Sequence, residues 1–301
     1  MSTVFQLASL EGESGVVLVP PGRHHGSVTI TRSLTLRGAS GAVLDGEGLH
    51  SSLRLDGPDA ELRLENLAFE NGGGPSGGSI HVASGRLVVS GCSFLRGASH
   101  RFGGGAIFSA GERLEVRRCR FEQNLGRQGG ALLLDEEVEA LICDSLFAYN
   151  AAVQGGALRL REGARATVVG CTFLANRTVV EGDGPGQGAS FALSGSTTRR
   201  PALRVENSLI ASAKDRALEL HNDAVVPGEV QLLSSLVPPS LQRLAQASCR
   251  VGEVELSGSL APERRGIADG LASGEAWIRV GSTDLTGAPR DAAVGAFCAR
   301  R

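Results

Sequence analysis

The chain has 301 residues, of which 42% are hydrophobic, and its 30 basic and 32 acidic side chains give a formal net charge of −2. This apolar share is enough to build a core, so wholesale disorder is excluded, and the near-neutral balance lacks the basic excess of a nucleic-acid or polybasic membrane binder. No apolar run approaches the roughly 18–20 residues of a membrane-spanning helix.

Glycine is the unusual component, with 42 residues, about twice the average share of roughly 7%. There is no G-X-Y period and there are only 11 prolines, which excludes collagen. The composition therefore predicts many tight corners between short strands.

The N-terminal part is predicted to hold short strands separated by corners. Residues 1–15 are expected to cap this end. They lack the basic flank and apolar stretch of a Sec-type signal, so the sequence predicts a cytoplasmic protein. Secretion by another route, or as a mature fragment, stays open. The first predicted strand segments are VVLVPPG (16–22), SVTITRSLTLRG (27–38), AVLDG (42–46) and SLRLDG (52–57).

The middle third repeats with a period of about 26 residues. Glycine pairs followed by a short apolar strand begin at Gly77, Gly104, Gly129 and Gly155, and a phenylalanine keeps the same phase. Apolar and polar residues alternate with the period of two that is typical of half-buried strands. Two markers in phase predict a parallel β-solenoid with one coil per unit. The phenylalanines are Phe69, Phe94, Phe121, Phe147 and Phe173.

The repeat also predicts ladders of like residues on successive coils. The phenylalanines are expected to point inward and to stack. An asparagine follows most of them by two or three residues, where a stacked side chain can bond the backbone of the next coil. Cysteines two residues before a phenylalanine point the same way and are expected to be buried, reduced thiols. The predicted ladder asparagines are Asn71, Asn124, Asn150 and Asn176, and the thiols are Cys92, Cys119 and Cys171.

The same pattern continues more loosely toward the C-terminus, with strands expected in 201–212, 217–223, 229–235 and 253–259. The sequence therefore predicts one all-β domain over 1–301, with about ten coils in 16–259 and a C-terminal cap or tail in 260–301. The segment PPSLQRLAQA (238–247) is the one expected short helix, because Ser240 follows a proline pair as a potential N-cap.

The opening VVLVPPGRHHGSVTITRSLTLRGASGAVLDG (16–46) resembles the first coils of right-handed parallel β-helix proteins of the pectin-lyase-like superfamily. The F-x-x-N and G-G-A-[IL] coils are similar to repeats of polymorphic outer-membrane proteins, and DLTGAPRDAAVGAFC (284–298) is similar to their closing segment. The resemblance implies a right-handed, single-stranded parallel β-helix. It implies no single activity, since this fold hosts lyases, hydrolases, epimerases, adhesins and phage fibres.

Enzymes of this superfamily place two or three carboxylates on neighbouring coils, whereas the marked coils offer almost no stacked acidic residues. The polygalacturonase motifs and the D-P-H-D motif of alginate epimerases are absent. His24 and His25 face opposite ways as strand residues, and the six cysteines form no C-x-x-C. No catalytic residue, metal site or cofactor is predicted.

The corner between F-x-x-N and the glycine pair varies most between coils, and variable corners on one side of a solenoid often mark its binding face. These corners predict a binding edge for a protein or an anionic glycan. We expect no nucleic-acid partner, because aromatic stacking platforms are missing. Plain solvated corners, a carbohydrate-active lyase or hydrolase, and a surface or phage-type fibre module stay open as alternatives. The predicted binding residues are His100, Arg101, Arg127, Gln128, Gln154, Arg177, Glu181 and Asp183.

Overall fold

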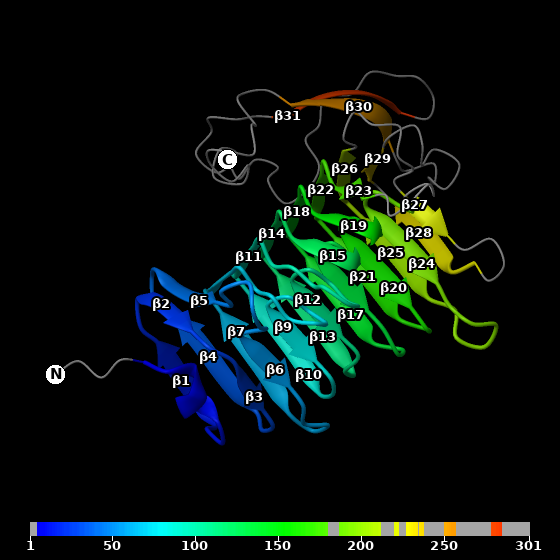
Figure 1. The fold of residues 1–301 in the computed structure, drawn as a ribbon. Coiled ribbons are helices and arrows are strands. Elements are labelled where there is room, and N and C mark those ends of the chain that lie inside the picture. Colours follow the sequence, from blue (N-terminus) through cyan, green and yellow to red (C-terminus); the bar gives the residue numbers. More distant parts are fainter. Residues whose placement is uncertain are drawn as a thin grey trace.

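The computed structural model describes residues 5–179, 187–211, 220–222, 227–233, 235–237, 250–256 and 278–284. The chain winds into a parallel β-solenoid, and Figure 1 shows its strands stacked side by side from β1 at one end to β28 at the other. Each turn contributes one strand to each of three long sheets, because alternating apolar residues bury one face of every strand.

Sheet A and sheet C both consist of parallel strands. Sheet A contains β1 (Gly15–Val19), β4 (Leu34–Gly38), β7 (Glu61–Glu65), β10 (Arg86–Ser90), β13 (Arg113–Arg117), β17 (Glu139–Cys143), β21 (Arg165–Val169), β25 (Ala202–Glu206) and β28 (Glu229–Leu233). Sheet C contains β3 (Val28–Ile30), β6 (Leu53–Leu55), β9 (Ile80–Val82), β12 (Ile107–Ser109), β16 (Leu132–Leu134), β20 (Leu158–Arg161), β24 (Phe191–Ser194) and β27 (Leu220–Asn222).

Sheet B forms the third long side, and a short sheet D occupies one corner. Sheet B contains β2 (Gly22–His25), β5 (Ala42–Asp45), β8 (Ala68–Glu70), β11 (Ser93–Leu95), β14 (Arg120–Glu122), β18 (Leu146–Ala148), β22 (Thr172–Leu174), β26 (Leu209–Ala211), β29 (Leu236–Val237), β30 (Arg250–Leu256) and β31 (Ile278–Asp284). Sheet D contains β15 (Leu125–Gln128), β19 (Ala151–Gln154) and β23 (Arg177–Thr178).

The solenoid has about seven turns rather than the ten that we predicted from the length of the chain. One reason is a long turn, because the register partners Arg165 and Ala202 stand 37 residues apart, against 26 for Glu139 and Arg165. The other reason lies beyond β29, where β30 still pairs parallel with β29 but β31 pairs antiparallel with β30, so the parallel ladder ends at β30. The predicted helix at 238–247 lies outside the described residues.

The centre of the solenoid holds a column of phenylalanine rings, one for each of five turns. Their centroids are 4.7 to 4.9 Å apart and neighbouring ring planes differ by at most 6°. Register pairing sets this spacing, because each phenylalanine is the Cα partner of the next. Burying each ring contributes roughly 1.5–3 kcal/mol. The column comprises Phe69, Phe94, Phe121, Phe147 and Phe173, and Phe191 closes it edge-on at 61°.

An asparagine ladder runs beside the rings, formed by Asn124, Asn150 and Asn176, which are at most 1% exposed. Each donates its side-chain amide to a phenylalanine carbonyl on the preceding turn, at 2.9 to 3.1 Å. The Oδ1 atom of Asn150 also accepts the backbone N–H of Asn124 at 3.0 Å. The ladder therefore satisfies buried backbone groups at the corner where sheet B ends.

Asn71 does not belong to this ladder, which corrects our expectation. It follows Phe69 by two residues, whereas the ladder asparagines follow their phenylalanines by three. Its position is the left-handed residue of the corner, with φ 49°, and the equivalent residues Tyr149 and Ala175 have φ 54° and 48°. The Asn71 side chain bonds Asp45 instead, at 3.2 Å.

A second polar column consists of thiols and hydroxyls just before sheet B. Cys92, Cys119 and Cys171 are free and buried, and serines take the same position on other turns. The backbone N–H of Cys119 donates to Ser145 Oγ at 3.1 Å, which links neighbouring turns. Burial raises the pKa of the Cys119 thiol to about 11 and that of Cys171 to about 12. These thiols therefore stay protonated at neutral pH.

A 3-10 helix, η1 (Leu7–Leu10), packs beside β3 at the N-terminal end of the coil. Leu7 and Leu10 are 1% exposed and join the solenoid core. Of the predicted C-terminal cap, residues 260–277 and 285–301 lie outside the described residues.

Candidate functional site

The corner predicted to bind a partner forms sheet D. Its three strands place Leu125, Ala151 and Arg177 in register on successive turns. Leu125 and Arg127 are exposed and Gly126 between them is buried, so the two exposed side chains lie on the outer face. Arg177 is exposed as well. Neighbouring strands are about 4.8 Å apart, which puts the Cα atoms of Leu125 and Arg177 roughly 10 Å from each other.

The loop 97–103 lies alongside β15, where Ala98 forms a bridge with Leu125. Ser99 fixes the shape of this loop, because its Oγ atom lies 2.7 Å from the Phe102 carbonyl and 3.1 Å from the Pro75 carbonyl. His100 and Arg101 are exposed at its tip. The loop thus holds these side chains beside the exposed face of sheet D.

A glutamine row closes the other end of sheet D. Gln128 and Gln154 are register partners, and Gln154 forms a bridge with Gln187 on the next turn. The Nε2 atom of Gln154 donates to Gln187 Oε1 at 2.5 Å. Sheet D therefore brings together Arg127, Gln128, Gln154 and Arg177 of the predicted edge. Glu181 and Asp183 lie outside the described residues.

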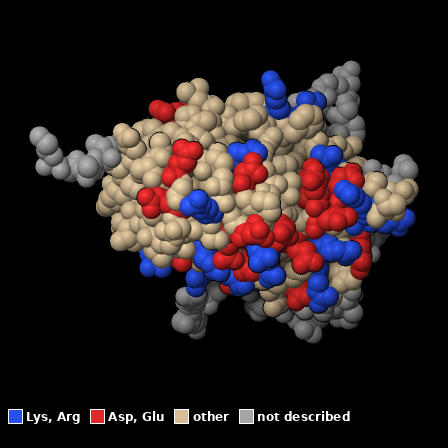
Figure 2. Space-filling model, turned by 90° about the horizontal axis from the view of Figure 1, so that it is seen from below, with Lys and Arg blue, Asp and Glu red and all other residues tan. Residues whose placement is uncertain are grey.

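The described part of this edge is cationic. The described segments 97–103, 125–128, 151–154 and 177–179 contain three arginines and no acidic residue. Neither Arg101 nor Arg177 makes an ion pair within the described part of the chain. The arginines of sheet A differ in their ion pairing, because six of the seven pair with glutamates at the surface. Figure 2 shows basic and acidic side chains interspersed in this way on one face. These arginines are Arg37, Arg63, Arg86, Arg113, Arg117 and Arg204.

Two large apolar side chains belong to the same edge, and our sequence analysis missed them. Phe102 is 57% exposed and Leu125 is 48% exposed. Both lie inside the variable corners that we had singled out for their polar residues. A hydrophobic residue in a corner that is otherwise polar was the signal that could have identified them.

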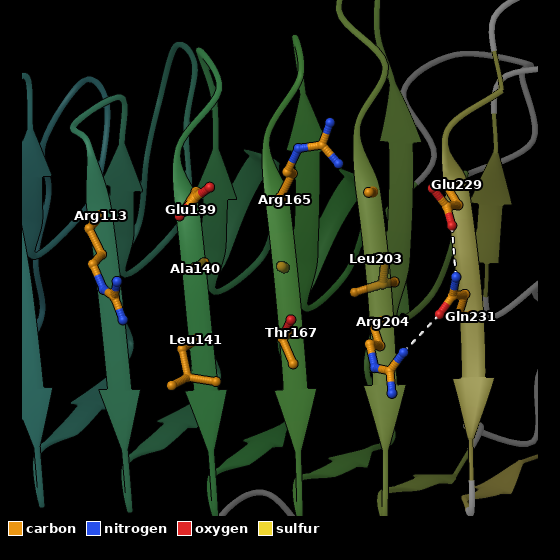
Figure 3. Close-up of a pocket in the computed structure, with 12 residues that line it drawn as sticks. Arg113, Glu139, Ala140, Leu141, Arg165, Thr167, Leu203, Arg204, Glu229 and Gln231 are labelled. Carbon is orange, nitrogen blue, oxygen red and sulfur yellow. Dashed lines mark hydrogen bonds between the residues drawn. The ribbon is translucent and has the colours of Figure 1, made fainter.

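A second candidate is an open depression of about 480 Å³ on the outer face of sheet A, shown in Figure 3. Its lining includes the small side chains of Ala202 and Thr167. Its acids, Glu139 and Glu229, are three strands apart in register, which is about 14 Å at 4.8 Å per strand. Paired catalytic carboxylates of glycosidases lie about 5–10 Å apart, so this pair does not fit.

Closer carboxylates occur on sheet B, where Asp45 and Glu70 are register partners. Arg23 binds both of them. Burial alone would raise the pKa of Asp45, but hydrogen bonds from the Glu47 N–H, Arg23 and Asn71 outweigh it and lower that pKa. A general acid needs a raised pKa, and Asp45 is only 6% exposed. This pair is therefore a structural network.

Within the described ranges, no three His, Cys, Asp or Glu side chains gather closely enough to hold a metal ion. His24 is 8% exposed and bonds the Pro20 carbonyl at 2.8 Å, whereas His25 is exposed. No helix in the described part of the chain has the length and apolar character to cross a membrane.

Comparison with known families agrees with this architecture. The family described as "Right handed beta helix region" matches residues 23–225, so the chain belongs to the right-handed β-helix family. Its fold is consistent with the pectin-lyase-like superfamily. No curated protein and no solved structure matches the chain.

Proposed function

We propose that the protein is a non-enzymatic β-helix scaffold that binds a protein partner through sheet D and the loop 97–103. The observation that supports this most directly is the combination of exposed Phe102 and Leu125 with Arg101 and Arg177, which lack ion pairs in the described residues. Arginine and aromatic residues are enriched at protein interfaces, where they often dominate the binding energy.

The chemistry of this edge selects an acidic partner. A guanidinium binds a carboxylate with two parallel hydrogen bonds, and the edge offers arginines from three different turns. An anionic glycan also carries carboxylates but has no large apolar groups to cover Phe102 and Leu125. The proposal therefore favours a protein surface that places acidic residues around an apolar patch.

A matched pair of triple variants tests this proposal. Arg101→Ala/Arg127→Ala/Arg177→Ala removes three charges from the edge. Arg37→Ala/Arg86→Ala/Arg204→Ala removes three charges from sheet A, where each arginine already has a glutamate partner. We expect the wild-type protein and the sheet A variant to retain the same proteins from a lysate of the source cells, and the edge variant to lose them.

Two defined probes accompany the lysate experiment. Binding to poly-L-glutamate and to a polyuronate is measured at low and high salt for all three proteins. Preferential binding of the polyuronate would favour the glycan alternative. An edge variant that retains the wild-type partners would contradict the proposed site.

A further inference from the structure

The first strands of the three long sheets differ in how their open edges are protected against pairing with another strand. β1, β2 and β3 are the terminal strands of sheets A, B and C. The helix η1 packs beside β3, and β2 carries Arg23 and two histidines. β1 has the sequence GVVLV without any charged residue. Open edge strands normally carry charges or a covering segment, and β1 has no charge.

The outward side chains of β1 are also unusual. Val16 is 61% exposed and Leu18 is 67% exposed, and these are two of the five large hydrophobic side chains exposed among the described residues. Val17, between them, packs against the core. β1 therefore presents an apolar surface at the end of a sheet in which β4, β7, β10, β13 and β25 carry paired charges.

The backbone of β1 shows which groups face the open edge. β1 pairs with β4 on one side, and the Val19 carbonyl accepts the Ala39 N–H at 2.9 Å. The N–H and C=O groups of successive residues point to opposite sides of a strand. Val16 and Leu18 therefore direct four backbone hydrogen-bonding groups away from β4, and no described strand lies on that side.

We propose that β1 is a self-association edge, to which the β1 strand of a second copy adds in antiparallel orientation about Val17. In this register Val16 of one copy opposes Leu18 of the other. Each such pair exchanges two hydrogen bonds, so all four open groups of each strand are satisfied. The pairing brings no charges together, and the outward Val16 and Leu18 side chains cover each other across the interface.

The two-fold symmetry of this pairing closes the assembly at a dimer. Pro20 and Pro21 follow β1 directly and lack backbone N–H groups, so the added strand cannot extend past Val19. A strand from the opposite end of another copy would continue the parallel ladder instead and would build an open-ended filament. The mass of the assembly distinguishes these outcomes.

Sedimentation equilibrium of the full chain over a range of concentrations tests the proposal. Leu18→Lys places a charge on the exposed edge without entering the core. Thr35→Lys is the matched control, because Thr35 is the register partner of Val16 one strand inward. We expect the wild type and Thr35→Lys to dimerise, and Leu18→Lys to weaken the dimer at least about tenfold. A monomeric wild type, or a mass that keeps growing with concentration, would overturn the proposal.

A cysteine experiment tests the register. In a background of Cys143→Ser, Cys249→Ser and Cys298→Ser, single variants Val16→Cys and Leu18→Cys are oxidised separately and as a mixture. The proposed register places residue 16 opposite residue 18 at a Cα separation of about 5.5 Å, which suits a disulfide. The mixture should form a disulfide-linked dimer, and each variant alone should not. Equal cross-linking of the separate variants would reject this register.

Discussion

The side-chain amide of Asn150 donates to Asn176 Oδ1 at 3.0 Å and to the Phe121 carbonyl at 2.9 Å, so one buried residue joins three successive turns of the solenoid. Its own Oδ1 accepts the side-chain amide of Asn124 at 2.9 Å. The corner after sheet B therefore depends on side-chain hydrogen bonds as well as on backbone pairing.

We predict that Asn150→Ala lowers the free energy of unfolding by about 3 kcal/mol or more, because it leaves several buried donors and acceptors unsatisfied. Urea denaturation measures this change. Asn66→Gly is the control, since Asn66 is exposed and its φ of 54° suits glycine. Equal losses in the two variants would mean that the ladder contributes no special stability.

The column of phenylalanine rings predicts that replacing a ring in its middle destabilises the protein more than replacing a ring at its end. Phe121 stacks on two rings, whereas Phe69 stacks on Phe94 and has Leu44 as its other register partner. Both are fully buried. Phe121→Leu should therefore be more destabilising than Phe69→Leu by about 0.5–1.5 kcal/mol, the energy of one aromatic pair beyond burial. Thermal and urea unfolding of both variants test this, and an identical loss would argue against ring stacking as a source of stability.

Ala175 offers a stabilising change. Its φ of 48° is in the left-handed region, which is unfavourable for alanine and open to glycine. Ala175→Gly should raise the free energy of unfolding by up to about 1 kcal/mol. Ala166→Gly, at a buried strand position, should lower it instead. A destabilised Ala175→Gly would show that strain at this corner is compensated elsewhere.

The pKa of Asp45 predicts a pH dependence. Because this pKa is lower in the folded state than its ordinary value of 3.8, the carboxylate stabilises the fold above that value. The stabilisation is lost as pH falls from 3.8 through the lower folded-state pKa.

At pH 7 we expect Asp45→Asn to lose about 1.5–3 kcal/mol, the range for hydrogen bonds to a charged group. The difference from the wild type should shrink below pH 3.8 and should stay constant between pH 5 and 7. Asp59→Asn, at an exposed residue, is the control for removing a surface carboxylate. A constant loss from Asp45→Asn down to pH 2 would refute the linkage.

The sequence predicted the coil because two markers repeated in phase, and the spacing of the phenylalanines equals the length of one turn. It overestimated the number of turns because nothing in a loose pattern distinguishes a long turn, such as the one from Arg165 to Ala202, from an additional coil. The error over Asn71 had a visible cause, since its distance from Phe69 is one residue shorter than in the ladder. Left-handed φ angles at Tyr149 and Ala175 follow from stacking on neighbouring turns, which their residue types do not indicate.

The position of the candidate edge could be predicted from the sequence, but the pairing and exposure of its side chains could not. Variable corner lengths located Arg101, Arg127 and Arg177 along one side. Most sheet A arginines have glutamate partners, whereas Arg101 and Arg177 have none among the described residues. This difference depends on the register between turns, which a single sequence does not give. Exposure of Phe102 and Leu125 likewise depends on how the loop 97–103 lies beside β15.

The asparagine ladder repeats at an interval of 26 residues, from Asn124 to Asn150 and again to Asn176. Residues 125–150, from the residue after one ladder asparagine up to and including the next, therefore make up one complete turn that can be repeated without changing the contacts at either end. A gene in which this module is duplicated would encode a rod longer by one rung, about 4.8 Å, with another arginine added to the edge. The number of arginines on that edge can thus be increased one turn at a time while the core contacts stay the same.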